Sequence, residues 1–468
     1  MLQYIPRSFL AGFIGVFVLT EFAWALGNTQ AIESYQSIFF SITEWSSLLL
    51  DGLCWVLALI PYVLILLPVL FFAFASICYK KNQTDPLSTN ENVHFTIIIP
   101  AYNEEKVILN SVNSMLKQNY PQDSFRVVVA FNGNDRSGQL AQEAGALVFT
   151  TPKVGVGKRN AINYVLEHLT PRIGMQNYIL VIDADNMVKP DFLLQMAKTV
   201  KEHKAIAVQG NHQPLIVDKN WISLGLSAAY RASSLLYNEG RSIAFHSALL
   251  CGTGFALRED VFRDLWPKTK TLTEDIELNG LLQQFYGAGV VWSREAYFYD
   301  EKPDNLAIAI RQRTRWMVGH FWCALLYAPS MIFNGIRQKN LRMIELGCYY
   351  LFPFALLGSV LSLILSVAMV SLHTDIYAHI NPTLLISLSV ILLFVYIFYV
   401  VVGDSLSKGF RQTPKRYRYF LRDALFSMAF ALAVWPIAII RATFMMCRED
   451  WIFHTPHKSV GYEQSTFK

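Results

Sequence analysis

The chain has 468 residues, of which 53% are hydrophobic and only 16% are charged, and its mean hydropathy is +0.30. These values exclude an ordinary soluble protein and favour a protein that is embedded in a membrane. The formal net charge of +5 gives no indication of a nucleic-acid partner. The six cysteines show no CxxC or other metal-binding spacing, which is typical of small buried residues in a reduced compartment.

Five apolar segments are long enough to cross a membrane as helices, since a bilayer core of about 30 Å needs roughly 20 residues. They occupy residues 9–27, 53–78, 344–370, 384–402 and 424–446. The first segment is too long for a secretion signal and has no small-residue cleavage site, so we expect it to remain as a span.

The charges of the connecting loops predict the orientation. Lys80 and Lys81 follow the second segment, and a run of Lys and Arg lies between the fourth and the fifth, whereas the loops at 28–36 and 373–382 carry neither residue type. The positive-inside rule therefore places the N-terminus and the large middle region in the cytoplasm, below a plasma or inner membrane. The basic loop is expected to contact the headgroups of anionic membrane lipids.

Residues 94–300 show a different pattern, in which short apolar runs alternate with helical sequence. Runs at 94–100, 125–131, 178–182 and 205–211 predict strands. Strands that alternate with helices indicate an α/β domain with a mostly parallel sheet and helices on both faces. Ligands of such sheets bind at the carboxyl ends of the strands.

The ends of the predicted strands are rich in polar side chains. These residues are Asn103, Glu104, Asn132, Asp135, Asp183, Asp185 and Asn186. In the sequence "IDADN", Asp183 and Asp185 directly follow an apolar strand, and their hard oxygens suit Mg²⁺ or Mn²⁺. A turn that is merely rich in Asp and Asn is the alternative interpretation of this motif.

The sequence "KVGVGKRN" places Lys158 and Arg159 at the start of a predicted helix, after Gly155 and Gly157. Basic residues at a helix N-terminus are a natural site for phosphate, although the spacing is not that of a P-loop. Acids for a metal and bases for phosphate in one domain together indicate a nucleoside diphosphate as the ligand.

The stretch "TLTEDIELNG", residues 271–280, has two interpretations. Thr271 and Glu274 fit the S/T-x-x-E capping box that begins a helix, and acidic residues suit the first turn. Taken alone, the stretch favours a helix cap over a catalytic carboxylate. The two roles are compatible if Thr271 and Glu274 form the cap while Asp275 points at a substrate.

Five motifs follow one another between residues 95 and 316, namely "IPAYNEE", "GKRNAIN", "DADN", "TEDIELN" and "RQRTRW". Each is weak alone, but the ordered set, flanked by membrane segments, resembles the membrane-embedded family 2 glycosyltransferases. The chain is similar in this respect to cellulose synthase, hyaluronan synthase and N-acetylglucosamine polymer synthases. The resemblance implies a GT-A type domain that uses a nucleotide-diphosphate sugar, with a UDP-sugar expected, and that inverts the anomeric centre.

The resemblance also implies roles on the donor side. Asp183 and Asp185 match the family's DxD motif and would bind the metal and the donor diphosphate. Further contacts to the nucleotide sugar are implied for Tyr102, Asn103, Glu104, Asn132, Lys158, Gln312 and Arg315. One departure concerns the second strand, where the family usually has Asp residues that contact the nucleobase. This chain has Ala130 and Phe131 there, so Asn132 or Asp135 would have to substitute.

On the acceptor side, Asp275 matches the carboxylate that deprotonates the acceptor hydroxyl. The other residues implied at the acceptor site are Cys251, Gly252, Thr253, Glu274 and Trp316. Trp316 closes the QxxRW motif, which begins at Gln312.

Three functions are compatible with these residues. The first is a processive synthase that extends a polysaccharide and passes it out between its own spans. The second is a transferase that adds one sugar to a lipid acceptor, similar to ceramide glucosyltransferase. The third is a non-catalytic nucleotide-binding subunit of a polysaccharide export complex, which only the altered "AFNGND" stretch favours. Product size separates the first two, because a polymer needs a channel and a lipid product does not.

The predicted domains follow from these patterns. They are two transmembrane helices at 1–78, a linker at 79–93, the catalytic domain at 94–300, interfacial amphipathic helices with the QxxRW motif at 301–340, about three membrane segments at 341–447 and a tail at 448–468. Five spans would leave this tail outside the cell. The tail resembles one that related transferases keep in the cytoplasm, so we predict a cytoplasmic tail and a last span broken near Pro436.

Overall fold

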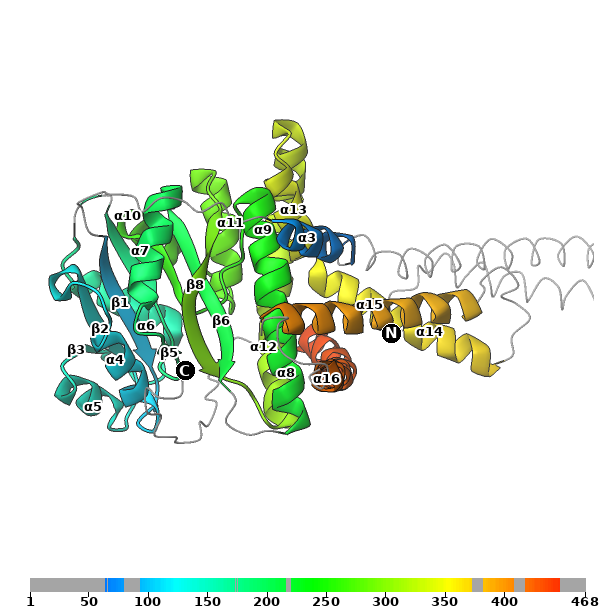
Figure 1. The fold of residues 1–468 in the computed structure, drawn as a ribbon, viewed down its shortest axis with the longest axis horizontal. Helices are drawn as coiled ribbons and strands as arrows, with labels where there is room; N and C mark the ends of the chain where they lie inside the picture. The colour runs from blue at the N-terminus through cyan, green and yellow to red at the C-terminus, as the bar shows by residue number, and fades with distance from the viewer. Residues whose placement is uncertain are drawn as a thin grey trace, which may run out of the picture. The chain divides into compact units, whose positions relative to one another are not determined.

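A computed structural model of the chain describes residues 64, 66–79, 93–172, 174, 176–215, 220–372, 382–407 and 417–446. The first predicted span, most of the second, most of the linker and the C-terminal tail lie outside the described residues. The chain divides into two compact units, and the unit of Pro61–Leu357 and Val390–Lys468 contains the sheet and the candidate site. Figure 1 shows the helices and strands.

The core of this unit is one eight-stranded sheet with the strand order β3-β2-β1-β4-β7-β6-β8-β5. Its strands are β1 (His94–Ala101), β2 (Phe125–Phe131), β3 (Leu147–Thr150), β4 (Asn177–Val181), β5 (Met187–Val188), β6 (Ala207–Leu215), β7 (Phe255–Arg258) and β8 (Val290–Glu301). The first four strands in this order are parallel, β7 is antiparallel to both β4 and β6, and β8 is parallel to β6. The predicted mostly parallel sheet is therefore confirmed, and the four predicted strands correspond to β1, β2, β4 and β6.

Helices cover both faces of this sheet, as the alternating pattern predicts (Figure 1). They are α4 (Ile108–Leu116), α5 (Ser137–Glu143), α6 (Gly157–His168), α7 (Phe192–His203), α10 (Glu259–Leu265) and α11 (Glu274–Tyr286). Successive side chains of a strand point to opposite faces. Ile97 and Ile99 of β1 therefore pack in one apolar core with α4 and α7, while Ile98 packs in another with α6 and α10. Both cores fix β1, and with it the carboxyl end that lies between β2 and β4.

A second group of helices comprises α3 (Leu67–Cys78), α8 (Trp221–Ala232), the π-helical η4 (Ser233–Asn238), α9 (Glu239–Phe245), α12 (Leu306–Gln338), α13 (Leu341–Tyr350) and α16 (Tyr417–Met445). Two short 3₁₀ helices, η3 (Gln122–Ser124) and η5 (Trp266–Lys268), lie elsewhere in the chain. Helix α8 packs against β6 and α16, and α12 packs against α11, α13 and α16. Asn side chains cap α8, α12 and α13, since Asn220 accepts from the N–H of Ser223, Asn305 from that of Ala307 and Asn340 from that of Met343.

Two of the described helices are long and apolar enough to cross a membrane, Leu306–Gln338 and Tyr419–Met445. A third crossing results if Leu341–Tyr350 and Phe352–Leu361, which are bent by 45°, act as one broken span. The last three predicted spans correspond to α13 with α14 (Phe352–Leu372), to α15 (Pro382–Ser407) and to α16. Most of the segment 301–340, predicted as interfacial helices, is the single helix α12. These helices support association of the chain with a membrane.

Candidate active site at the strand ends

Asp183 and Lys158 meet at the carboxyl end of β4. Asp183 lies two residues after this strand, and Lys158 is the second residue of α6. The Lys158 ammonium lies 2.6 Å from Asp183 Oδ1 and donates another hydrogen bond of 2.6 Å to the carbonyl of Gly252. The side chains are 26% and 37% exposed, respectively, so a ligand can reach both. The helix-start base and the strand-end acid thus form one polar centre.

A buried hydroxyl group holds the backbone of the "DADN" turn. Thr253 Oγ1 accepts from the N–H of Asp183 at 2.8 Å and from Nδ2 of Asn186 at 2.7 Å. Because Thr253 is only 4% exposed, these two hydrogen bonds hold the turn from the interior of the protein. An acceptor contact of Thr253 stays a prediction, next to this observed role in orienting Asp183.

Asp183 and Asp185 are carboxylates of intermediate exposure, one residue apart. Within the described ranges, no group of three or more His, Cys, Asp and Glu side chains could hold a metal ion. Two carboxylates still fit Mg²⁺, which keeps several waters and commonly takes other ligands from substrate phosphates. The turn therefore suits a metal that is bound together with a phosphate ligand, and it does not form a closed protein site.

Asp275 is the second residue of α11 and faces Gly252. A Cβ atom at Gly252 would lie 3.3 Å from Asp275 Oδ2, and the φ of +79° at this glycine is one that other residues rarely adopt. Burial raises the pKa of Asp275, and the charges of Lys158 and Arg315 act against this rise. Burial likewise raises the pKa of Glu274. Asp275 is thus a partly desolvated carboxylate within the field of both cations.

The capping box predicted for Thr271 and Glu274 is wrong. Helix α11 begins at Glu274 with Thr273 as its N-cap, and no side-chain capping hydrogen bond is made there among the described residues. The buried carboxylate of Glu277 accepts instead from the N–H groups of Lys270 and Thr271, both at 2.7 Å, and from the Tyr327 hydroxyl at 2.5 Å. Thr271 lies too far before the helix to cap it. The carboxylate of Glu277, one turn inside the helix, instead accepts the hydrogen bonds of the preceding loop.

The QxxRW segment lies on α12 and contacts the loop before Asp275. Arg315 Nη1 donates to the carbonyl of Leu272 at 3.3 Å, and its Nε is buried without a partner among the described residues. Gly319, one turn later, permits the close approach, since a Cβ there would lie 2.5 Å from Thr273 Oγ1. The motif thereby places the guanidinium of Arg315 beside the loop before Asp275, with the Nε–H as an unused hydrogen-bond donor.

The predicted donor residues of β1 and β2 lie at neighbouring strand ends. Asn103 has a φ of +57°, and its Oδ1 accepts from the N–H of Asn134 at 2.9 Å. Asn132 is 3% exposed, and its Oδ1 has no partner within the part of the chain that is described. Asp135 accepts from the N–H groups of Ser137 and Glu105, both at 3.0 Å. Of the two proposed substitutes for the nucleobase contact, Asn132 therefore keeps an unused acceptor, whereas the Asp135 carboxylate already ties two loops together.

The segment at 251–254 is held by a residue that the sequence patterns did not indicate. Gln209 of β6 is fully buried, donates to the carbonyl of Thr253 at 2.9 Å and accepts from the N–H of Cys251 at 2.9 Å. An amide inside the apolar run "AIAVQGN" is the signal that could have found it. Burial raises the pKa of Cys251 to about 12, which favours the protonated thiol over the nucleophilic thiolate.

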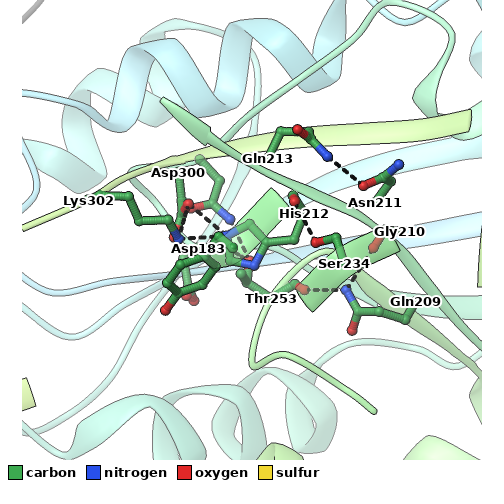
Figure 2. Close-up of polar contacts among 12 residues, drawn as sticks. Asp183, Gln209, Gly210, Asn211, His212, Gln213, Ser234, Thr253, Asp300 and Lys302 are labelled. Atoms are coloured by element: carbon green, nitrogen blue, oxygen red, sulfur yellow. Dashed lines mark hydrogen bonds and ion pairs between the residues drawn. The ribbon is translucent and has the colours of Figure 1, made fainter. Parts of the chain in front are cut away.

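A second group that the sequence did not indicate joins β6 to the end of β8 (Figure 2). His212 Nε2 lies 2.6 Å from Asp300 Oδ1, and Lys302 Nζ donates to Asp300 Oδ2 at 2.8 Å. Burial lowers the pKa of His212, although Asp300 acts in the opposite direction. Burial acts to raise the pKa of Asp300, but His212 and Lys302 hold it below its ordinary value. The group is therefore a buried ion pair of Lys302 and Asp300 beside the imidazole of His212.

Comparison with known proteins identifies the domain that carries these residues. Residues 92–319 match the family model described as "Glycosyltransferase like family 2". The probable glycosyltransferase YdaM of Bacillus subtilis is 24% identical over 367 residues, which cover 75% of this chain and 82% of the relative. The poly-beta-1,6-N-acetyl-D-glucosamine synthase of Staphylococcus aureus is 24% identical over 259 residues, 54% of this chain and 60% of the synthase. The match thus spans less than two thirds of that synthase.

A solved structure is similar as well. The mannosyltransferase PcManGT of Pyrobaculum calidifontis, in complex with GDP-Man and Mn2+, has a TM-score of 0.49 and 17% sequence identity, and the match covers 81% of this chain and 98% of that chain. The family match confirms the predicted family for the domain at residues 92–319, and the mostly parallel sheet of that domain is the one predicted. Individual site residues stay predictions that the geometry above supports.

Proposed function

This chain carries a glycosyltransferase domain of family 2, and we propose that it moves a sugar from a nucleotide-diphosphate sugar onto a growing polysaccharide at the cytoplasmic face of a membrane. The observation that carries this proposal is the convergence of Lys158, Asp183 and Asp275 around Gly252. A basic and an acidic group for a diphosphate complex lie there beside a separate, partly desolvated carboxylate. Such a set provides both a site for the leaving group and a base.

The donor diphosphate is proposed to bind between Lys158 and the "DADN" turn. Asp183 and Asp185 would hold Mg²⁺ or Mn²⁺, and the bound ion would neutralise charge on the departing diphosphate. Lys158 and Arg315 would add positive charge at the same oxygens, since preorganised charges stabilise a leaving group that becomes negative. Lys158 would then exchange its contact with Asp183 for one with phosphate, which its partial exposure permits.

Asp275 is proposed as the general base. Its carboxylate would take the proton from the acceptor hydroxyl while the hydroxyl oxygen forms a bond to the anomeric carbon. The bond between that carbon and the diphosphate oxygen breaks at the same time, so the electron pair leaves with the diphosphate. Attack from the side opposite to the leaving group inverts the anomeric centre. The raised pKa of Asp275 suits a base that must take up a proton.

A polysaccharide is proposed as the acceptor because of two observations together. One relative of this chain is named a polymer synthase, and the described helices are apolar enough to associate the site with a membrane through which a polymer can leave. A UDP-sugar is the donor that we propose to test first. Processive extension with secretion through the chain's own spans completes the proposal.

The test uses the full chain purified in detergent. It is incubated with a panel of UDP- and GDP-sugars, with Mg²⁺, Mn²⁺ or EDTA, and the product is sized. A polymer formed from one donor, and abolished by EDTA, is the expected result. A product of one sugar on a lipid would replace the polysaccharide by a lipid acceptor. Release of no nucleoside diphosphate from any donor would contradict the transferase proposal altogether.

A further inference from the structure

Arg313 lies among aromatic rings where three helices meet. Its guanidinium carbon lies 4.2 Å from the ring centre of Trp316 in α12, 5.7 Å from that of Phe430 and 6.0 Å from that of Trp435, both in α16. It also lies 6.0 Å from the ring centre of Tyr230 in α8. Arg313 is 2% exposed, and among the described residues no carboxylate pairs with it. Its Nη1 donates to the side-chain oxygen of Gln312, so aromatic rings and neutral oxygens surround its charge, and cation–π contacts are strongest where the cation is desolvated in this way.

Tyr230 connects these rings to a second buried cation. Its hydroxyl accepts a long hydrogen bond of 3.4 Å from Arg313 Nη2, and Lys302 Nζ lies 3.3 Å from its ring centre. Lys302, whose side chain is 2% exposed, is held by Asp300 beside His212 (Figure 2). A chain of contacts therefore runs from the end of β8 through α8 to α12.

The two faces of α12 explain why this chain of contacts ends on the tryptophan of the QxxRW motif. Residues three apart on a helix share a face, so Arg313 and Trp316 lie together. Arg315 faces the loop before α11 and donates to the carbonyl of Leu272. The guanidinium beside the Asp275 loop and the guanidinium among the rings thus belong to different faces of one helix.

We propose that Lys302, Tyr230 and Arg313 are positioning residues that fix the Trp316 indole and thereby determine how the acceptor sugar is held. This rests on the proposed function and on the acceptor contact that the family resemblance implies for Trp316. Lys302 fixes the ring of Tyr230, and the hydroxyl of that ring orients the planar guanidinium of Arg313. The guanidinium in turn lies against the indole.

An apolar side chain could fill the space of Arg313 or Lys302, but it would not orient a ring. Loss of either charge should therefore weaken binding of the acceptor and leave the donor site and Asp275 unchanged. If these residues only filled space, their loss would instead weaken the binding of both donor and acceptor and lower the stability of the fold. The two roles are separable by measurement.

The first experiment observes the indole directly and needs no substrate. The full chain is produced with 5-fluorotryptophan, purified in detergent and studied by ¹⁹F NMR, with Trp316→Phe to assign one resonance among the ten tryptophans. Tyr230→Phe removes only the hydroxyl and leaves the ring beside Lys302, so it is the mildest variant, and Lys302→Met is the remote one. Both are expected to displace the Trp316 resonance and to leave that of the buried Trp266 unchanged. Arg337→Lys, at an exposed position near the end of α12, is the matched control.

The second experiment separates acceptor from donor. Sugar transfer to a short oligosaccharide of the sugar that the wild type polymerises is compared with donor hydrolysis in the absence of acceptor. In Arg313→Lys, which keeps the charge but removes the planar guanidinium that lies against the indole, we expect the acceptor KM to rise about tenfold, because a compact ammonium on a flexible stem does not orient the ring. Donor KM and donor hydrolysis should change less than about twofold.

The outcomes decide between the proposals. A Trp316 resonance that stays in place in both Tyr230→Phe and Lys302→Met overturns the positioning role, as does an equal fall of hydrolysis and transfer in Arg313→Lys. A wild-type chain without any transferase activity would contradict the proposed function, while the resonance of Trp316 would still test whether these residues fix its indole.

Discussion

Charged side chains differ in exposure between two regions of this protein. One is the donor side at the ends of β1, β2 and β4, and the other is the second group of helices with α15, called the helix side. At the ends of β1, β2 and β4, charged groups are partly exposed, as the 26% and 37% exposure of Lys158 and Asp183 shows. Two ion pairs among the helices are buried instead, Arg241 with Glu345 and Arg231 in α8 with Asp404 in α15, and the second pair is 9% and 0% exposed. Exposed charges can exchange partners when a ligand arrives. Buried charges hold elements together and cannot exchange without a large cost of desolvation.

This contrast separates residues that bind from residues that position. A pair near the surface contributes at most about 1 kcal/mol to stability, so Lys158 can leave Asp183 for a phosphate at little cost. Removal of one partner of a buried pair leaves an uncompensated charge, which is far more destabilising. Substitutions on the two sides should therefore affect different quantities, namely catalysis on the donor side and stability on the helix side.

The largest effect is expected from Arg231→Met. It leaves the fully buried Asp404 without its guanidinium partner and should reduce the free energy of unfolding by about 3–5 kcal/mol. Thermal unfolding of the full chain in detergent measures this loss. The control is Lys198→Met, which breaks an i,i+4 pair with Glu202 at a half-exposed site and should cost less than about 1 kcal/mol. Equal losses in the two variants would remove the contrast between the two sides.

The next largest effect is expected from Asp275→Asn in the candidate active site. The variant keeps the shape of the side chain but removes the base, so sugar transfer should fall by about 10²-fold or more. Binding of the donor and the metal should persist, because the "DADN" turn is unchanged, and isothermal titration with a nucleoside diphosphate and Mg²⁺ checks this. A folded Asp275→Asn protein that still transfers sugar at a near-normal rate would refute the assignment of the base.

The pH dependence of transfer should reflect the same carboxylate. Burial raises the pKa of Asp275, so the proton that blocks the base is bound at a higher pH than in an ordinary carboxyl group. Transfer should fall about tenfold for each pH unit below this raised pKa and level off above it. In Arg315→Gln, the residual activity should show its midpoint at a still higher pH, because one of the cations that lower the pKa is lost. A midpoint that moves down in this variant would contradict the proximity of the two charges.

The strand ends are the part of the site that the sequence could predict. Apolar runs that alternate with helices specify β1, β2, β4 and β6, and parallel strands bring their carboxyl ends to one edge. The contact of Lys158 with Asp183 follows from that rule, although the two residues belong to different motifs. The parts that local patterns cannot specify depend on long-range pairing. The antiparallel β7, which places Gly252 and Thr253 beside the acids, is four residues long and gives too short a signal.

The buried charges of β6, β8 and α12 could likewise not be predicted from the sequence. His212 and Asp300 meet only because β6 and β8 pair in parallel, and Arg313 appears in the sequence as one more basic residue of "RQRTRW". The capping box failed for a related reason. The pattern of Thr271 and Glu274 was present, but the buried Glu277 competed for the same loop and formed the stronger, charge-assisted hydrogen bonds.

The smallest effect is therefore expected from Thr271→Ala. As an N-cap, Thr271 would contribute about 1 kcal/mol, but its hydroxyl instead donates to the carbonyl of Thr273 at 3.3 Å, accepts from the N–H of that residue at 3.4 Å and lies 3.6 Å from the sulfur of Cys323. Such long, local hydrogen bonds lie at the low end of the usual range, so the loss should be about 0.5 kcal/mol, with transfer unchanged within about twofold. Glu277→Gln is the matched comparison and should cost more, because it replaces the charged acceptor of two N–H groups. A loss above about 1 kcal/mol in Thr271→Ala, with none in Glu277→Gln, would restore Thr271 as the residue that begins this helix.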